Sequence, residues 1–300
     1  MAENSNIEWT THTFNPWRGC TKVSAGCANC YAEAMSKRNP GVLGVWGDDG
    51  TRVLAADSYW KQPYKWHRDA EGAEERHRVF CASLADVFED REDVMLARER
   101  LMILIENTPS LDWLLLTKRP QNVMRLVFRE WTHNFPSNVW LGTSIENQEA
   151  ADERIPELVK CPAGNRFLSM EPLLGEVDVR QYLYSDYDKA AHDRQFFTPL
   201  EGFTHAKVLW VVVGGESGPN ARPMHPDWAR SICDQCSEAG VPFFFKQWGE
   251  HSQDMVRVGK RDAGRELDGK TWDEIPGLEP ADTIRVSKVE NENNEGENSA

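Results

Sequence analysis

Three cysteines near the start of the chain have the spacing of a metal site. Cys20, Cys27 and Cys30 fall within eleven residues, and a glycine directly precedes each of the first two. Glycine permits backbone turns that bring thiols together, and two cysteines separated by two residues can face one centre. A bound metal and the nearby Lys22 would hold the sulfurs as thiolates. These residues predict a three-thiolate metal site, which we interpret as the binding site of an iron–sulfur cluster.

Zinc is an alternative metal for the same loop. Structural zinc takes four protein ligands, and His12 could complete a set with the three cysteines. No fourth cysteine lies nearby in the sequence, and a four-iron cluster held by three thiolates keeps one iron open for a small molecule. The spacing therefore favours the cluster, while His12 keeps zinc open. A second close pair, Cys233 and Cys236, falls within a predicted helix. This pair could be structural, or it could act as a second ligand pair or a redox pair.

Polar residues follow directly after six apolar runs. They are Ser83 and Asp86; Lys118 and Arg119; Glu146; Glu171; Gly214, Gly215 and Glu216; and Lys246, Gln247 and Trp248. In barrels and open parallel sheets, ligands bind at the carboxyl ends of the strands. An ordinary polar turn would explain one such ending, but six of them predict a shared polar site.

The elements that must position these residues are strands and helices in alternation. Six nearly continuous apolar runs are typical of strands covered on both faces: Val79–Leu84, Trp113–Thr117, Val139–Gly142, Arg166–Met170, Val208–Val213 and Val241–Phe245. Helical spacing lies between them, as in Val94–Asn107 and in Pro226–Ala239, which ends before a capping Gly240. The alternation predicts an α/β protein with a parallel sheet, either a barrel or an open doubly wound sheet.

One large domain and two small segments are expected. Residues 1–252 would form the barrel-like α/β domain, with the cysteine loop near its start and an insertion at 176–206. Residues 253–285 have the glycine punctuation of hairpins and would form a small C-terminal appendage. Residues 286–300, rich in Glu and Asn, would be a disordered acidic tail.

Composition excludes several classes of protein. A chain of 300 residues with 40% hydrophobic content can bury a large core without disulfides. Seven cysteines without a signal peptide indicate free thiols or metal ligands, and no apolar run could span a membrane, so we expect a cytoplasmic protein. The formal net charge of −14 argues against non-specific nucleic-acid binding but leaves room for a local basic groove.

The order of several short motifs resembles the phage-associated three-Cys-motif family. These motifs are Ile7-Glu8-Trp9-Thr10, Phe14-Asn15-Pro16-Trp17, the cysteine segment from Gly19 to Glu33, Leu116-Thr117-Lys118-Arg119-Pro120, Val139-Trp140-Leu141-Gly142, Glu171-Pro172-Leu173-Leu174-Gly175, Val213 to Pro219 and Phe244 to Gly249. The resemblance runs in order from about residue 6 to residue 250.

The barrel and cysteine loop of that family are similar to those of radical S-adenosylmethionine (SAM) enzymes, which include the photoproduct lyases that repair DNA. The resemblance implies a complete or partial parallel (β/α) barrel, with Cys20, Cys27 and Cys30 holding a 4Fe–4S cluster whose open iron binds SAM. Reductive cleavage of SAM would then give a radical that abstracts hydrogen from a substrate. The cysteine spacing, and a Gly-Gly-Glu placed after a late strand, differ from the commonest pattern of those enzymes.

From this resemblance we expect a radical-SAM-like enzyme that modifies or repairs a nucleobase or nucleic acid in a phage or mobile-element setting. Residues expected to seat SAM are Ser83, Asp86, Gly214, Gly215 and Glu216; those expected in catalysis are Lys118, Glu146, Glu171 and Lys246; and those expected to bind substrate are Arg119, Gln247 and Trp248. The expected partners are a nucleic acid or nucleotide substrate, an electron-donor protein and the three-Cys-motif partner protein.

Two other classes of function remain open. A zinc-stabilised binding or adaptor protein would use the same strand ends as a recognition surface without chemistry. A metal-dependent hydrolase would use Asp86, Glu171 and Glu216 as ligands or bases.

Overall fold

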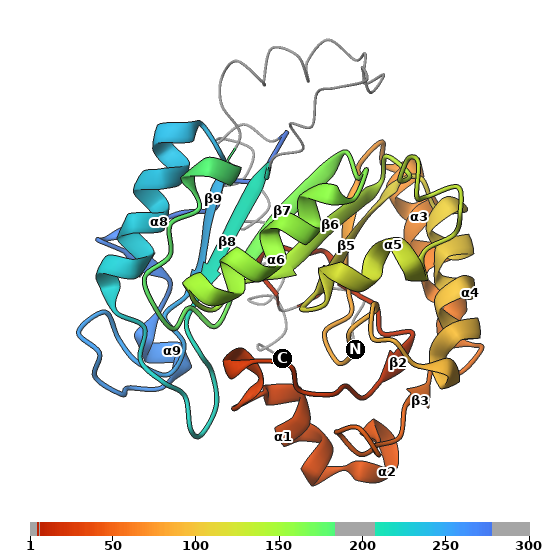
Figure 1. Ribbon diagram of the computed structural model, residues 1–300, viewed down its shortest axis with the longest axis horizontal. Coiled ribbons are helices and arrows are strands. Elements are labelled where there is room, and N and C mark those ends of the chain that lie inside the picture. Colours follow the sequence, from red (N-terminus) through yellow and green to blue (C-terminus); the bar gives the residue numbers. More distant parts are fainter. Residues whose placement is uncertain (1–4, 6, 184–207, 278–300) are drawn as a thin grey trace, which may run out of the picture.

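A parallel sheet forms the centre of the computed structural model, which describes residue 5 and residues 7–183 and 208–277 (Figure 1). Its seven strands in the described chain are β1 (His12–Thr13), β4 (His77–Cys81), β5 (Leu111–Thr117), β6 (Val139–Ser144), β7 (Asn165–Met170), β8 (Trp210–Gly214) and β9 (Phe243–Gln247). They lie side by side in sequence order, and every neighbouring pair is parallel. This is the order of strands in an opened β/α barrel. The prediction of an α/β fold with a partial parallel barrel is confirmed.

Helices cover the outer face of the sheet (Figure 1). The main ones are α3 (Gln62–Gly72), α4 (Met95–Glu106), α5 (Val123–Leu126), α6 (Gln148–Lys160) and α8 (Pro226–Ala239), with short 3₁₀ turns η2 (Tyr59–Lys61), η3 (Glu92–Val94), η4 (Pro120–Asn122) and η5 (Arg180–Tyr182). At the start of α8 the ring of His225 accepts a hydrogen bond from the N–H of Asp227 at 3.2 Å. The helix ends at Gly240, whose left-handed backbone (φ 64°) confirms the predicted cap.

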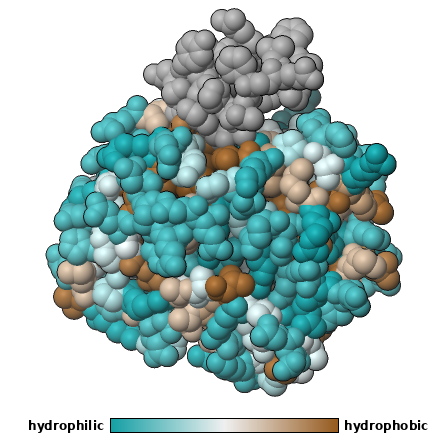
Figure 2. Space-filling view, in the orientation of Figure 1, coloured by the Kyte–Doolittle hydropathy of each residue, from teal (hydrophilic) through white to brown (hydrophobic). Residues whose placement is uncertain are grey.

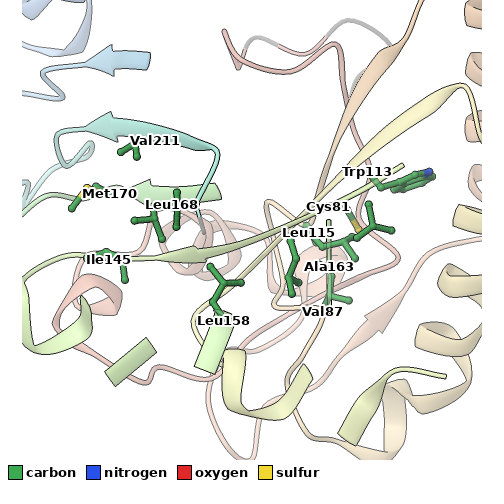
Figure 3. Packing of buried hydrophobic residues seen from close by; sticks show 14 of the residues in the cluster. Cys81, Val87, Trp113, Leu115, Ile145, Leu158, Ala163, Leu168, Met170 and Val211 are labelled. Carbon is green, nitrogen blue, oxygen red and sulfur yellow. The ribbon is translucent and has the colours of Figure 1, made fainter. Parts of the chain in front are cut away.

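Apolar side chains hold the sheet from both faces. Leu115, Leu168 and Val211 belong to the cluster between the sheet and its helices (Figure 3). On the opposite face, Leu114 and Trp210 belong to a second, largely aromatic cluster. Successive residues of a strand point to opposite faces, so Leu114 and Leu115 serve different clusters. Coverage on both faces explains why the strands are nearly continuous apolar runs.

The cysteine segment lies in a small layer below the sheet in Figure 1. This layer contains the antiparallel pair β2 (Trp17–Arg18) and β3 (Val53–Leu54), the 3₁₀ turn η1 (Ala25–Cys27), and the helices α1 (Tyr31–Arg38) and α2 (Pro40–Leu43). Cys27 ends η1, and Cys30 directly precedes α1.

The chain after β9 packs back against the sheet. It contains α9 (Lys260–Ala263) and the hairpin of β10 (Glu266–Leu267) and β11 (Lys270–Thr271). Asp273 forms an antiparallel bridge with Phe244, and Ile275 is buried in the second cluster. Residues 184–206 of the predicted insertion, residues 278–285 of the predicted appendage and the predicted tail at 286–300 lie outside the described residues.

Hydrophilic side chains cover most of the surface in Figure 2. Large exposed apolar side chains occur in small numbers in several elements, such as Leu96 on α4 at 74% exposure and Leu54 on β3 at 53%. Across the residues whose structure is described, no helix has the length and apolar character that a membrane span requires.

Candidate functional site

The cysteine loop, residues 19–31, lies across the carboxyl ends of the strands. The N–H of Gly26 donates to Oε1 of Glu146, two residues after β6, at 3.3 Å. Nδ2 of Asn29 donates to Oε2 of Glu216, two residues after β8, at 3.0 Å. Parallel strands end at one edge of a sheet, so both contacts fix the loop over the same edge. We call this edge, together with the loop that lies across it, the barrel mouth.

Two further side chains join the loop to the barrel mouth. Nη2 of Arg222 donates to the carbonyl of Ala25 at 3.0 Å, while its Nε donates to Glu216 at 2.8 Å. Burial favours the protonated form of Glu216, but the bonds from Arg222 and Asn29 outweigh it and hold the pKa of this carboxyl below its usual value. The phenol of Tyr31 donates to the carbonyl of Ser83 at 2.6 Å. Glu216 and Ser83 thus contact the loop itself.

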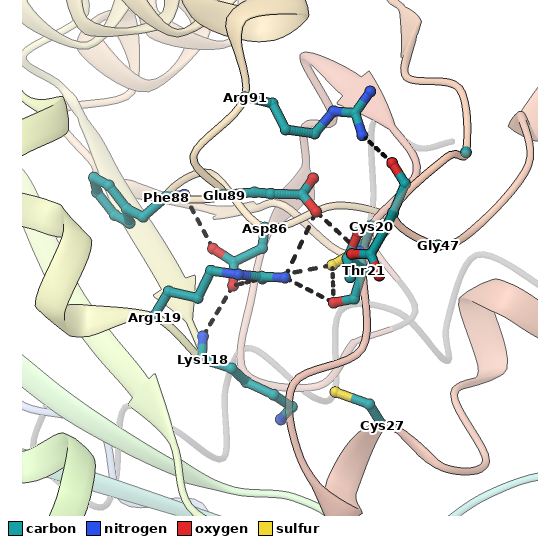
Figure 4. Close-up of polar contacts among 12 residues, drawn as sticks. Cys20, Thr21, Cys27, Gly47, Asp86, Phe88, Glu89, Arg91, Lys118 and Arg119 are labelled. Carbon is teal, nitrogen blue, oxygen red and sulfur yellow. Dashed lines mark hydrogen bonds and ion pairs between the residues drawn. The ribbon is translucent and has the colours of Figure 1, made fainter.

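Cys20 lies against buried charged side chains (Figure 4). Nη1 of Arg119 lies 3.7 Å from its sulfur and 2.8 Å from Oδ2 of Asp86, and Nη2 donates to the carbonyl of Thr21 at 2.7 Å. Burial and the negative charge of Asp86 raise the pKa of Cys20 to about 12, against an opposing effect of Arg119. In the absence of a metal, Cys20 is therefore a neutral thiol at neutral pH.

A second arginine extends this charged group. Nε of Arg52 donates to Oε2 of Glu89 at 2.7 Å, and its Nη2 donates to Oγ1 of Thr21 at 2.9 Å. Oε1 of Glu89 also lies 3.6 Å from Nη2 of Arg119. We call Arg52, Asp86, Glu89 and Arg119 the Cys20 charge network.

Cys27 and Cys30 are half-buried, as is Cys20. Burial is the main cause that raises the pKa of Cys30. The side chain of Lys118 extends toward Cys27 in Figure 4, and its Nζ forms no hydrogen bond or ion pair with any residue that the structure describes. Burial alone would raise the pKa of Glu146, but the charge of Lys118, a bond from Ser24 and the charge of Arg154 lower it. Lys118 is thus a cation at the barrel mouth that acts on Glu146 through its charge, while its ammonium makes no hydrogen bond or ion pair among the described residues.

The donor atoms of the loop suit a sulfur-bound metal. Cys20, Cys27 and Cys30 are free thiols of one loop, with a guanidinium beside one of them, which is the chemistry of an iron–sulfur or zinc site. As they stand, no three His, Cys, Asp or Glu side chains in the described residues lie close enough together to hold a metal ion. A single metal ion held by all three cysteines would require the sulfurs to approach one another.

His12, the candidate fourth zinc ligand, has other contacts. Its Nε2 lies 3.2 Å from Nδ1 of His77, and its ring stacks on Trp66 with centroids 4.3 Å apart. Only 3% of His12 is exposed. The structure therefore places this histidine in the packing of β1 and β4 against α3, apart from the cysteine loop.

A second polar group lies at the ends of the last three strands. Nζ of Lys246 lies 2.8 Å from both carboxylate oxygens of Glu171. Nε2 of Gln247 donates to Glu171 and to Oγ of Ser217, both at 3.1 Å. Oε1 of Gln247 is buried and has no hydrogen-bond partner among the described residues. We call Glu171, Ser217, Lys246 and Gln247 the Glu171 cluster.

Close packing accounts for the glycine pair after β8. A Cβ on Gly215 would lie 2.0 Å from the carbonyl oxygen of Trp248, and one on Gly214 would lie 3.2 Å from Cδ of Glu171. Trp248 is only 2% exposed, and its indole donates to the carbonyl of Glu266 at 2.7 Å. The ring of Trp248, a predicted substrate contact, packs in the core beside Phe245.

The remaining cysteines are buried. Cys233 and Cys236 lie within α8, as predicted, and Cys81 and Cys161 lie in the core. Burial raises the pKa of Cys233 to about 12 and raises that of Cys236 as well. Both are therefore protonated thiols at neutral pH, as expected for a structural pair.

Sequence reasoning did not identify several residues that position the loop. Arg52 and Glu89 are separated by 37 positions, and no motif links them. Arg222 lies in the irregular segment between β8 and α8. Nη1 of Arg154 lies 2.8 Å from Glu146. Arg154 follows Glu146 by eight residues and lies in the first turns of α6, and this short spacing was the one sequence signal that could have indicated the pair.

Fold and site together define an open parallel α/β barrel with a cysteine loop across its mouth. The chain belongs to the family described as "Protein of unknown function (DUF5131)", which matches residues 4–276. No curated protein sequence matches it.

Three solved structures of spore photoproduct lyase are similar to this chain. A single-residue variant shares 14% identity with a TM-score of 0.41, covering 77% of this chain and 62% of that one. A double variant with bound AdoMet and dinucleoside spore photoproduct shares 14% identity with a TM-score of 0.38, covering 76% and 61%. A complex with dinucleoside spore photoproduct shares 13% identity with a TM-score of 0.37, covering 75% and 60%. The chain thus spans about three fifths of the length of those lyases.

Proposed function

We propose that this protein is a radical-SAM-like iron–sulfur enzyme in which Cys20, Cys27 and Cys30 are the thiolate ligands of a 4Fe–4S cluster. The observation that carries the proposal is the position of the cysteine loop. Hydrogen bonds to Glu146 and Glu216 hold it over the carboxyl ends of parallel strands. This is the edge at which barrels and open parallel sheets bind their ligands.

The protein's own residues would hold and orient the reactants. A bound cluster with SAM supplies one-electron, hydrogen-abstracting chemistry once an electron-donor protein has reduced it. In the Glu171 cluster, a carboxylate and an ammonium stand together, at 21% and 13% side-chain exposure. Such a pair complements a zwitterion like the amino-acid end of SAM. Asp86 and Glu216 pair with Arg119 and Arg222, and both arginines also donate to backbone carbonyls of the cysteine loop, so we assign these two carboxylates to positioning the loop.

The proposed substrate is a nucleobase or nucleic acid, in a phage or mobile-element setting. Resemblance to the three-Cys-motif family supports this class of substrate. The same resemblance supports the three-Cys-motif partner protein as an interaction partner. Lys118, whose ammonium makes no hydrogen bond or ion pair among the described residues, is a cation that would meet a phosphate of such a substrate. A reducing cytoplasm would keep the thiols available for the cluster.

The geometry gives less support to a hydrolase. Asp86, Glu171 and Glu216 each pair with a different cation. No group of three carboxylates in the described chain is arranged as a metal site.

Anaerobic purification of the full chain tests the proposed function. We expect a brown protein with about four irons per chain that cleaves SAM on reduction with dithionite. Cys20→Ser, Cys27→Ser and Cys30→Ser should each lose the iron. Cys161→Ser is the matched control, because its hydroxyl can replace the bond that the Cys161 sulfur donates to the carbonyl of Glu157 at 3.5 Å. One zinc per chain and no colour would instead identify a zinc-stabilised binding protein.

A further inference from the structure

The Cys20 charge network surrounds only one of the three loop cysteines. The side chains of Arg52, Glu89, Arg119 and Asp86 are 0%, 5%, 9% and 7% exposed. Two guanidinium groups balance two carboxylates, so the network is neutral without the cysteine. A thiolate at Cys20 adds one buried negative charge, which must be met by a nearby cation or hydrogen-bond donor.

Arg119 has the geometry to meet that charge. Its Nη1 carries two N–H bonds and has two acceptors within reach, Oδ2 of Asp86 at 2.8 Å and Sγ of Cys20 at 3.7 Å. Asp86 also accepts bonds from the hydroxyl of Thr117 at 2.7 Å and from two backbone N–H groups at 3.0 Å. These donors and one N–H of Arg119 Nη1 satisfy Asp86, so the second N–H of Nη1 is available to the sulfur of Cys20.

The other two cysteines lack such a donor. The one side-chain hydrogen bond of Cys27 among the described residues is with the hydroxyl of Ser24, 3.9 Å away. The side chain of Lys118 extends toward Cys27 and its charge acts on Cys30, but no cationic side chain among the described residues donates a hydrogen bond to either sulfur. The backbone of Cys20 is also fixed, because its carbonyl accepts from the N–H of Gly47 at 3.0 Å. Among the described residues, Cys20 is therefore the one loop cysteine whose sulfur is bonded to a cation.

We propose that Arg119 is a positioning residue that donates an N–H···S hydrogen bond to the Cys20 thiolate of a bound cluster and raises the reduction potential of that cluster. The inference rests on the proposed function. One-electron reduction, by a donor protein or by dithionite, increases the negative charge on the cluster and its sulfurs. A guanidinium beside one sulfur stabilises the reduced form more than the oxidised form, and hydrogen bonds to the sulfurs are among the factors that set such potentials.

A potentiometric titration of the full chain under anaerobic conditions, followed by electron paramagnetic resonance of the reduced cluster, measures this effect. Arg119→Gln should shift the midpoint potential to more negative values by at least about 59 mV, a tenfold change in a one-electron equilibrium. Arg119→Lys, which keeps the charge, should recover part of the shift. Arg230→Gln is the control, because Arg230 pairs with Asp227 and Asp268 and with no residue of the cysteine loop, so its potential should equal that of the wild type.

A balanced double variant guards against loss of the fold. Arg119→Gln leaves Asp86 without its cation, so Arg119→Gln combined with Asp86→Asn removes both charges together. An unchanged potential in an iron-loaded double variant overturns the inference. So does a double variant that is folded by circular dichroism but takes up no iron, because Arg119 would then be needed for loading. A wild-type chain without iron would instead overturn the proposed function, and iron analysis shows this before any potential is measured.

Discussion

The backbone N–H of Gly26 and the carboxylate of Glu146 lie 3.3 Å apart and join the cysteine loop to the end of β6. Glu146 is only 1% exposed and also pairs with Arg154 of α6, so its position is fixed by that helix as well as by the loop. One buried carboxylate thus connects α6, the sheet and the loop that carries the three cysteines.

This contact leaves little room for a larger residue in the loop. A Cβ on Gly26 would lie 3.1 Å from Cδ of Glu146. We expect Gly26→Ala to push the loop away from the strand end, to destabilise the protein by about 1 kcal/mol, and to lower the iron content after anaerobic reconstitution. Gly41→Ala in α2 is the control, because its Cβ meets nothing within 4 Å. Equal iron content in the two variants would contradict the role of this contact.

The charge of Glu146 predicts a pH dependence of stability. Lys118, Ser24 and Arg154 lower its pKa despite burial, so the folded state favours the carboxylate. This stabilisation is complete above the ordinary glutamate value of 4.5 and is lost as the pH falls through the lower pKa of the folded state. Glu146→Gln should cost about 1.5–3 kcal/mol at neutral pH, and urea unfolding should show the difference from the wild type narrowing in acid. A difference that does not change with pH would mean that the charge of Glu146 contributes nothing.

Much of the fold follows from the sequence because its signals are local. Each of the six predicted strands overlaps a strand of the sheet, since side chains buried on both faces leave continuous apolar runs. β1 was not predicted, because a two-residue strand such as His12–Thr13 has no periodicity to detect. The convergence of Glu146, Glu171 and Glu216 also follows from the shared edge of a parallel sheet.

The partners of these residues do not follow from the sequence. Asp86 and Glu216 were expected to face SAM, and in the structure they pair with Arg119 and Arg222. Such pairs depend on how loops from distant positions pack, which leaves no periodic or spacing signal. The position of a carboxylate at a strand end can therefore be predicted from the sequence, whereas its role depends on which cation the fold places beside it.

Arg222 offers a test of how the loop is held. Loss of its bonds to Ala25 and Glu216 should cost about 1 kcal/mol locally and raise the population of open loop about fivefold. We therefore expect iodoacetamide to label Cys27 and Cys30 several times faster in the metal-free Arg222→Gln variant, as measured by mass spectrometry. Arg230→Gln is the matched control, since Arg230 has the same side-chain exposure of 36% but pairs with Asp227 and Asp268. Equal labelling in both variants would mean that Arg222 does not restrain the loop.

A substitution at Gly215 distinguishes two explanations for the glycine pair Gly214–Gly215. If Gly215 serves the packing of β8 against β9, alanine is excluded by the carbonyl of Trp248, 2.0 Å from the added Cβ. Gly215→Ala should then destabilise the protein by about 2–3 kcal/mol and lower its urea midpoint. Gly72→Ala, at the end of α3, meets nothing within 4 Å and should leave the midpoint unchanged or raise it. If Gly215 instead only allows SAM to approach the backbone, Gly215→Ala will unfold like the wild type and lose SAM binding in equilibrium dialysis. We expect the first result, because the contact with Trp248 exists without any ligand.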